Sequence, residues 1–388
     1  MKKLLLAGAT FGACSSVAYA QSSVVLYGVA DVGINIQSNV QGHAAYAQNS
    51  GMMQGSRLGF LGSEDLGGGM KAIFQLENGF DITSGRAGQG GLLFGRQAFV
   101  GLSNRFGVLT FGRQYDSHLD AVLKFAAANQ GASIAAAHPA DLDNTNYTYR
   151  SNNSIKFTSN PLQDITASAQ YSVGGQPGNF TGAQIWSLAL SYSNGATSAG
   201  VGYLDAKNPN IGLLGSASAT PQASSSANVT SPVISGLMSA SAYKGLAAGA
   251  AYALGDVTLS ALYSHTRFLG LGDLTSGPNP AHLTGSATFD TYEVNLQYRP
   301  SPSWLLGAAY LFTDGGSSSG AVGARYRQVA ADIHFLFSKR TDVYIACVYQ
   351  HAAGRDSTGR SAVAAINGLS PSSSADAALV RIGLRQRF

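Results

Sequence analysis

The segment DTYEVNLQYRP, residues 290–300, alternates polar and apolar side chains from Thr291 to Arg299. One set of alternate positions carries Tyr292, Val294, Leu296 and Tyr298. The other set carries Thr291, Glu293, Asn295, Gln297 and Arg299. A repeat of two residues is the period of a β-strand, whose successive side chains point to opposite faces. The segment therefore predicts a strand, and the fold depends on whether its apolar face covers a protein core or meets lipid.

The same alternation recurs along the chain. It is found in LYGVADVGINIQ (26–37), KAIFQLENGF (71–80), YRSNNSIKF (149–157), DVYIACVYQ (342–350) and the C-terminal RIGLRQRF (381–388). In the last of these, three arginines share one face, and Ile382, Leu384 and Phe388 share the other. Segments of about ten alternating residues are typical of a transmembrane β-barrel, whose apolar face meets lipid and whose polar face lines an aqueous interior. The prediction rests on the number of such segments.

The connections between these segments are alternately short and long. The short ones are dense in turn-forming residues: GSEDLGGGM, SNRFG, SNPLQD, SNGATS, LGD, RPSPSW and SKRTD. The longer polar stretches lie at 38–55, 80–92, 117–147, 174–183, 206–238, 268–287, 314–324 and 353–376. Seven short turns and eight long loops predict an all-β fold. We expect a 16-stranded antiparallel transmembrane β-barrel with short periplasmic turns and long extracellular loops.

The composition agrees with a protein that exposes little of its outer surface to water. Only 11% of the 388 residues are Asp, Glu, Lys or Arg, against roughly 25% in a typical soluble domain. After residue 20 the chain has no uninterrupted apolar run of about 18 residues, so we expect no transmembrane helix. Aromatic residues near the strand ends, such as Tyr298, Trp304 and Phe337, suit girdles at the two membrane interfaces.

The N-terminal MKKLLLAGATFGACSSVAYA, residues 1–20, is organised like a secretory signal, with two lysines, a short apolar region and AYA at its end. We expect cleavage after Ala20, which leaves a single barrel domain at 21–388. Loss of Lys2 and Lys3 lowers the formal charge from +4 to +2. So small a charge does not favour a nucleic acid as a partner.

Several stretches carry a more specific resemblance. They are LYGVADVGI (26–34), GSRLGFLGSEDLGGGMKAIFQLENGFD (55–81), FGRQAFVGLSNRFGVLTFGRQYD (94–116), RSNNSIKF (150–157) and GLRQRF (383–388). Together they are similar to general porins of the neisserial and burkholderial type, over essentially the whole mature chain. The resemblance implies a trimeric outer-membrane barrel whose third loop folds inward. It also implies a water-filled pore for passive diffusion of ions and small hydrophilic solutes.

The resemblance also implies partners in the membrane, and no cofactor. Phe388 resembles the outward-facing aromatic residue that the barrel-assembly machinery reads in this family. Outer-membrane lipid and lipopolysaccharide would surround the apolar faces. Outward residues of the first and last strands, such as Ala30, Val32 and Ile382, suit barrel–barrel packing in a homotrimer.

Strand parity turns Arg57, Glu77, Asp116 and Arg150 toward the interior. In the family, matching positions form an arginine cluster on the wall, opposite acids on or near the third loop. The implied pore-lining set is Arg57, Arg96 and Arg150, with Glu77 and Asp116 as counter-charges and Asp120 as an addition. Three arginines against two acids predict a weak anion preference. Asp141 and Asp143 would cancel it if the loop tip turned them inward.

Local alternation places Arg96 and Arg113 on the apolar side, with Ala98 and Phe111. An arginine facing lipid at mid-depth costs about 2–4 kcal/mol. These two arginines therefore lie beyond the hydrocarbon band, or a β-bulge re-aims them.

Two positions depart from the family pattern. Relatives commonly carry a lysine where this chain has Leu61, so one inward positive charge is missing and a weaker anion preference is expected. The third loop of relatives often carries a PEFGG-like turn, whereas this chain has HPADLD at 138–143. Because of that difference, the resemblance does not predict the path of the loop tip.

Motifs for enzymatic chemistry are few. SGRAGQGG (84–91) neither follows a buried parallel strand nor opens a helix, so it does not predict a phosphate-binding loop. The seven histidines show no metal-ligand spacing, and His334 is the one that parity places inward at mid-strand. We expect no enzyme. The alternatives are a substrate-specific outer-membrane channel for a small anionic or polar solute, and a secreted soluble adhesin or sandwich.

Overall fold

The computed structural model describes residues 23–217, 229–273, 277–320 and 322–388. The expected signal segment, residues 1–20, lies outside the described residues. No helix within the described ranges is long and apolar enough to cross a membrane. The strands are β1 (Ser23–Val40), β2 (His43–Ser50), β3 (Arg57–Gly67), β4 (Met70–Gly79), β5 (Gln97–Asn104), β6 (Gly107–Gln114), β7 (Ser151–Ser159), β8 (Ile165–Ser172), β9 (Ile185–Asn194), β10 (Thr197–Lys207), β11 (Ala242–Leu254), β12 (Val257–Leu271), β13 (Gly285–Ser301), β14 (Trp304–Ser317), β15 (Gly323–Leu336), β16 (Thr341–Arg355) and β17 (Asp376–Arg387).

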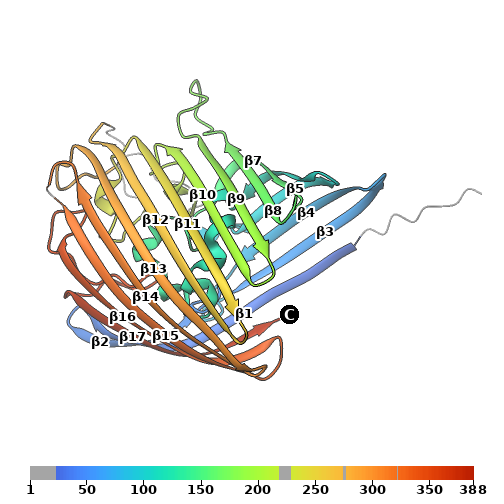
Figure 1. Cartoon of the computed structure of the whole chain (residues 1–388). Coiled ribbons are helices and arrows are strands. Elements are labelled where there is room, and N and C mark those ends of the chain that lie inside the picture. The colour runs from blue at the N-terminus through green and yellow to red at the C-terminus, as the bar shows by residue number, and fades with distance from the viewer. Residues whose placement is uncertain (1–22, 218–228, 274–276, 321) are drawn as a thin grey trace, which may run out of the picture.

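The strands pair antiparallel around a closed ring (Figure 1). β1 pairs with β2 through residues 32–40 and with β3 through residues 23–29, so β2 and β3 are two halves of one wall strand. The described chain therefore forms 16 wall strands. β17 pairs with β1, from Val29 opposite Arg387 to Gln37 opposite Leu379, and closes the barrel. Closure removes the strand edges, so wall backbone groups are bonded without water.

Each of the seven predicted short turns joins two neighbouring strands, but the prediction of a long loop at 38–55 is wrong. In place of a loop at 38–55, β1 and β2 meet in a tight turn at Gln41 and Gly42. Both turn residues have a positive φ, 53° and 89°, as a two-residue hairpin turn requires. The chain then leaves the wall at residues 51–56, which we call the inner bulge. The loop expected at 314–324 is also shorter, because β14 ends at Ser317 and β15 begins at Gly323.

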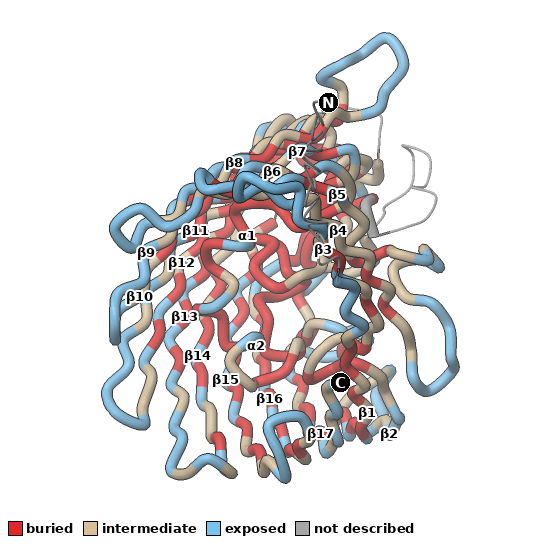
Figure 2. Tube along the Cα trace, turned by 90° about the vertical axis from the view of Figure 1, so that its right-hand side faces the viewer, coloured by how far each residue is buried: buried red, intermediate tan, exposed pale blue. Residues whose placement is uncertain are grey.

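The predicted alternation of faces is confirmed. On β13, Val294 is 57% exposed and Glu293 is 3% exposed. On β1, Ile34 is 56% exposed and Asp31 is fully buried. Figure 2 shows this alternation of exposed and buried positions along the strands. Large apolar side chains are exposed along the outer face of the wall, so this surface suits lipid.

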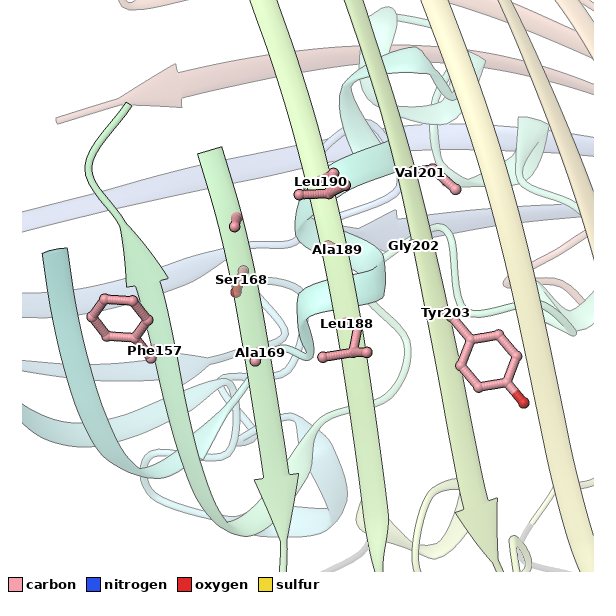
Figure 3. A pocket seen from close by; sticks show the side chains of 10 residues that line it. Phe157, Ser168, Ala169, Leu188, Ala189, Leu190, Val201, Gly202 and Tyr203 are labelled. Atoms are coloured by element: carbon pink, nitrogen blue, oxygen red, sulfur yellow. The ribbon is translucent and has the colours of Figure 1, made fainter. Parts of the chain in front are cut away.

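The outer apolar face is hollowed over β7–β10. Figure 3 shows Phe157, Leu188, Leu190 and Tyr203 around this trough, with the small side chain of Ala169 between them. The helix behind these strands lies on their inner side. This stretch of wall therefore separates an apolar outer face from a loop packed inside.

The segment between β6 and β7, residues 115–150, lies inside the barrel, and we call it the third loop. Its short helices are α1 (Ser117–Val122), η2 (Leu123–Phe125), α2 (Ala127–Gln130), η3 (Ile134–Ala136) and η4 (Pro139–Asp141). α1 packs on β9, β10 and β11, and α2 packs on β13 and β14. A Cβ at Gly200 or Gly202 of β10 would collide with the backbone of Ala121 or His118. These glycines therefore permit the close approach of α1 to the wall.

The described parts of loops 208–241, 272–284 and 356–375 also turn inward. Leu237, Leu283 and Ala365 from these loops are buried in one apolar cluster. Tyr243 of β11 and Phe268 of β12 belong to the same cluster. The cluster occupies the interior beside the second half of the wall. The opposite side of the interior, along β2–β7, contains a cavity.

Candidate functional site

A cavity of about 490 Å³ lies inside the barrel between the third loop and the wall, and we call it the aperture. Its charged lining comes from the wall side: Arg57 begins β3, Arg96 precedes β5 and Arg150 precedes β7. The facing side is formed by residues of the third loop without ionised side chains: Ala128, Asn129, Ile134, Asn146, Tyr147 and Thr148. Other rim residues are Gly51, Gln54, Gln89 and Asn367. The structure thus brings together the three arginines that the sequence grouped.

Glu77 of β4 is shared between two of these arginines. Its Oε1 lies 2.7 Å from Arg96 Nε, and its Oε2 lies 3.6 Å from Arg57 Nε. The Tyr27 hydroxyl donates to the same Oε2 at 2.8 Å. One carboxylate between two guanidinium groups leaves an excess of positive charge on this wall.

Arg150 contacts two groups of the third loop that carry no charge. Its Nη2 donates to the Tyr115 hydroxyl at 2.7 Å, and its Nη1 donates to the Thr148 carbonyl at 2.7 Å. The guanidinium also lies over the Tyr115 ring, 4.8 Å from the centroid. These contacts orient the guanidinium without cancelling its charge.

The structure decides between the two alternatives for Arg96 and Arg113. The pairing of β6 with β7 shifts register between Gly112 and Gln114, so a bulge re-aims Arg113. Arg113 Nε donates to the Gly95 carbonyl at 2.8 Å. Arg96 lies just outside β5 and therefore does not follow the parity of that strand. Neither arginine points to lipid.

Asp116 does not face the aperture, which corrects its assignment as a counter-charge there. It is fully buried. Its Oδ1 accepts the Leu119 amide at 2.9 Å, and its Oδ2 accepts Asn144 Nδ2 at 2.6 Å. Asp116 therefore caps the N-terminus of α1 and connects the start of the third loop to Asn144 near the end of the same loop. Strand parity assigned Asp116 wrongly because β6 ends at Gln114, two residues earlier, and the alternation of faces does not continue beyond the strand.

Asp120 is paired away from the arginines. Its carboxylate lies 2.6 Å from Lys156 Nζ on β7, and its side chain is 44% exposed. The pairing of Lys156 with Asp120 was not predicted from the sequence. Because the two charges offset each other, Asp120 adds little negative field at the aperture.

Asp141 and Asp143 are also buried within the third loop. Asp141 Oδ1 accepts the amides of Thr145 and Asn146 at 2.8 and 3.0 Å. Asp143 Oδ2 lies against His138 Nδ1. Neither acid lines the aperture, so the cancellation that would follow from an inward-turned tip does not occur.

His138 fastens the third loop to the wall, and sequence reasoning missed this role. Its Nε2 lies 3.0 Å from Glu293 Oε2 on β13, and Glu293 Oε1 accepts the Ala127 amide at 2.6 Å. Burial alone would lower the pKa of His138, but the carboxylates of Asp143 and Glu293 outweigh burial and raise this pKa well above its usual range. The imidazole is therefore a cation at neutral pH. The only signal in the sequence was an inward acid on β13 and a histidine in HPADLD.

The inner bulge is a second inward element that the sequence did not reveal. Asp31 Oδ2 accepts the amides of Met53 and Gln54 at 2.7 and 3.2 Å. The Met52 carbonyl accepts the Ile134 amide at 2.8 Å. The bulge therefore supports the tip of the third loop from the β1 side and forms part of the aperture rim.

Arg381 anchors the strands behind the inner bulge. It was expected on the aqueous face, and it does point inward, but it is fully buried. Its Nε donates to the Tyr344 hydroxyl at 2.8 Å, and its Nη1 donates to Asn35 Oδ1 at 2.8 Å. Its Nη2 lies 3.6 Å from Asp31 Oδ1. Arg381 thus stabilises the closure between β1 and β17.

His334 faces inward, as parity indicated, and is buried. Its Nδ1 lies 3.0 Å from Asp342 Oδ2, and its Nε2 lies 3.0 Å from the Gly131 carbonyl of the third loop. Leu61, which stands where relatives carry a lysine, pairs with Gln75 and is 41% exposed. Within the described ranges, no group of three or more His, Cys, Asp or Glu side chains is arranged to hold a metal ion.

A family model described as Gram-negative porin matches residues 5–355 of this chain. An outer membrane porin protein of Bordetella pertussis is 39% identical over 166 residues, which cover 37% of this chain and 43% of that protein. Outer membrane porin protein 32 of Delftia acidovorans is 41% identical over 114 residues, which cover 29% and 32%. Both matches span less than half of the relative's length.

Solved structures share the fold at low identity. The anion-selective porin from Comamonas acidovorans aligns with a TM-score of 0.72 and 19% identity, over 95% of this chain and 100% of that one. OmpF of Salmonella typhi aligns with a TM-score of 0.62 and 17% identity, over 94% and 97%. At these identities the likeness concerns the barrel itself.

We predict that Glu293→Gln loosens the third loop. The change removes one carboxylate from the bridge to His138, and breaking a buried pair costs about 3 kcal/mol. Hydrogen exchange at the Ala127 amide should accelerate. Glu64→Gln, at an exposed position near the end of β3, is the matched control.

The same bridge has a defined pH response. Because the pKa of His138 is raised, its contribution is complete below the ordinary histidine value of about 6.5 and is lost only as pH rises through the raised value. Acidification from pH 7 to pH 5 should therefore leave the protection factor of the Ala127 amide, its exchange rate relative to an unstructured amide at the same pH, unchanged. A lower protection factor at pH 5 would contradict the assignment.

Proposed function

Because this chain belongs to the Gram-negative porins, we propose that it forms a water-filled channel through which ions and small hydrophilic solutes diffuse passively across the outer membrane. The observation that carries the proposal is the aperture, a cavity inside a closed barrel between a fixed loop and a wall of arginines. Its relatives are outer-membrane porins rather than enzymes. We propose that this chain likewise catalyses no reaction.

We propose that the channel prefers anions, and more strongly than a count of charges in the sequence implies. Arg57, Arg96 and Arg150 face the aperture, while Glu77 is shared by two of them. The acids of the third loop are buried or paired elsewhere. A unit charge about 4 Å from a passing ion, at an effective dielectric near 20, contributes about 4 kcal/mol before screening. The structural relative from Comamonas acidovorans is itself described as anion-selective.

We predict that the double variant Arg57→Ser/Arg150→Ser loses anion preference. Two of the three guanidinium groups disappear, while the third loop that sets the bore stays in place. In planar bilayers under a salt gradient, the zero-current potential should move toward cation selectivity. The shift should be larger at low ionic strength, because the Debye length is about 8 Å at 0.15 M and longer in dilute salt.

Arg325→Ser is the control for this measurement, since Arg325 is 63% exposed and paired with Asp314 at the loop end of the barrel. An unchanged potential in the double variant would show that these arginines do not set selectivity. The same recordings test the alternative of a substrate-specific channel, which the additional inward loops favour. Block of the current by one anionic or polar solute, and not by others of its size, would support that alternative.

We propose that the barrel assembles as a homotrimer, with outer-membrane lipid and lipopolysaccharide around it. β5, β6 and β8 have only eight residues each, whereas β12 and β16 have 15. Eight residues rise about 26 Å, or about 20 Å when tilted by about 40°, less than the apolar band of about 25 Å. Neighbouring barrels would cover this short side and spare it a mismatch with lipid.

Chemical crosslinking in mild detergent should therefore trap three subunits, and boiling should release one. We propose that the short strands, rather than the first and last strands expected from the sequence, make the interface, so Val100→Arg on the outer face of β5 should weaken the trimer. Val294→Arg on the long β13 is the matched control, since both valines are well exposed. Native mass spectra with only single barrels would overturn the proposal.

We propose that Phe388 serves as a recognition signal for the barrel-assembly machinery. Its amide and carbonyl bond to the carbonyl and amide of Gly28 at 3.1 and 2.9 Å. Its side chain is 45% exposed and lies over Gly28, where a Cβ would collide with the ring. The ring is thus presented at the seam where the first and last strands meet.

Deletion of Phe388 should lower the amount of folded barrel in the outer membrane and raise periplasmic degradation. Arg387→Gln, one residue earlier on the inner face, should have a smaller effect. Quantitative blotting of membrane fractions makes the comparison. Equal surface levels for the deletion and the unaltered chain would refute the role of Phe388.

A further inference from the structure

A second cavity, of about 840 Å³, opens at the short-turn end of the barrel. Four basic side chains line it: Arg299, Lys339, Arg385 and Arg387. They come from the end of β13, the turn after β15, and β17. In the orientation proposed above, this end is the periplasmic mouth.

The basic lining of this mouth is continuous with the aperture. Gln54 lines the aperture, and its Oε1 accepts Arg385 Nη1 and Arg387 Nε, both at 3.4 Å. The guanidinium of Arg387 also interacts electrostatically with those of Arg385 and Arg57. Arg57 interacts in the same way with Arg96, and Arg96 with Arg150. Neighbouring cations therefore follow one another from the mouth into the aperture.

The acids near the mouth do not balance these cations. Asp342 is buried, and its oxygens lie 2.9 and 3.0 Å from Arg385 nitrogens and 3.0 Å from His334. Arg387 lies farther from it, at 3.7 Å, and its side chain is 34% exposed. Asp332 is likewise buried and lies 3.1 Å from His334. Asp256 is the acid in the cavity lining itself and sits on an exposed turn. Arg299, Lys339 and Arg387 thus leave an excess of positive charge facing water.

We propose that the periplasmic mouth holds a second anion-binding stage, formed by Arg387 with Arg299 and Lys339, for small carboxylate or phosphate anions leaving the aperture. This inference rests on the proposed function as an anion-preferring channel. An ion bound strongly at one site leaves slowly, and a neighbouring site of the same sign preference lowers the barrier to its exit. The second stage therefore raises anion flux without narrowing the bore.

The three C-terminal arginines then have different roles. Arg381 is fully buried and stabilises the wall, and Arg385 is bonded to Asp342. Arg387 is the member of the set whose charge is partly exposed and only loosely paired. It is therefore the residue to change without disturbing the closure of the barrel.

The test is a triple variant, Arg299→Gln/Lys339→Gln/Arg387→Gln, in planar bilayers at low ionic strength. The anion-to-cation permeability ratio should fall about twofold, with a smaller effect in concentrated salt. Inorganic phosphate added on the periplasmic side should inhibit chloride current less than in the unaltered channel. Arg340→Gln, on the same turn but outside the cavity lining, should change neither reading. Heat-modifiable migration on gels confirms that each variant is folded.

An unchanged permeability ratio and unchanged phosphate inhibition in the folded triple variant would overturn the second stage. If Arg57→Ser/Arg150→Ser still moved the zero-current potential, the proposed function would stand while this inference failed. If neither set of variants altered selectivity, both would fail. A loss of selectivity confined to the triple variant would place the selective step at the mouth and support the inference.

Discussion

Every backbone amide and carbonyl of the wall must find a partner within the wall, because a lipid interior offers no water. The pairing of β17 with β1 meets this requirement by joining the two ends of the sheet. Sixteen strands leave an interior wide enough to hold loops as well as water. The inward folding of the third loop and the inner bulge depends on that enclosed space.

The interior is organised by buried polar contacts rather than by an apolar core alone. His138 and Glu293 hold the third loop on one side, and Asp31 and Arg381 hold the inner bulge on the other. Such buried charges are costly unless they are paired and hydrogen-bonded. Their pairing fixes two rigid elements, which meet where the Ile134 amide bonds to the Met52 carbonyl.

The charge of the aperture follows from how the acids are used. The third loop carries Asp116, Asp120, Asp141 and Asp143, yet three of them are buried in its own scaffold and Asp120 pairs with Lys156. The acid that does pair with the wall arginines is Glu77, which Arg57 and Arg96 share. An aperture that a charge count would make nearly neutral is therefore basic. The same sign of charge continues to the mouth through Gln54 and Arg387.

The sequence by itself determined the barrel, its number of strands and which residues face inward along regular strands. These features depend on local alternation and turn chemistry, so Arg57 and Glu77 could be placed correctly. Parity failed at Asp116, which lies beyond the end of β6, and at Arg113, where a bulge intervenes. Only the tertiary structure decided which charges stay near the aperture. The partners that settle this come from distant segments, as with His138 and Glu293, 155 positions apart in the chain.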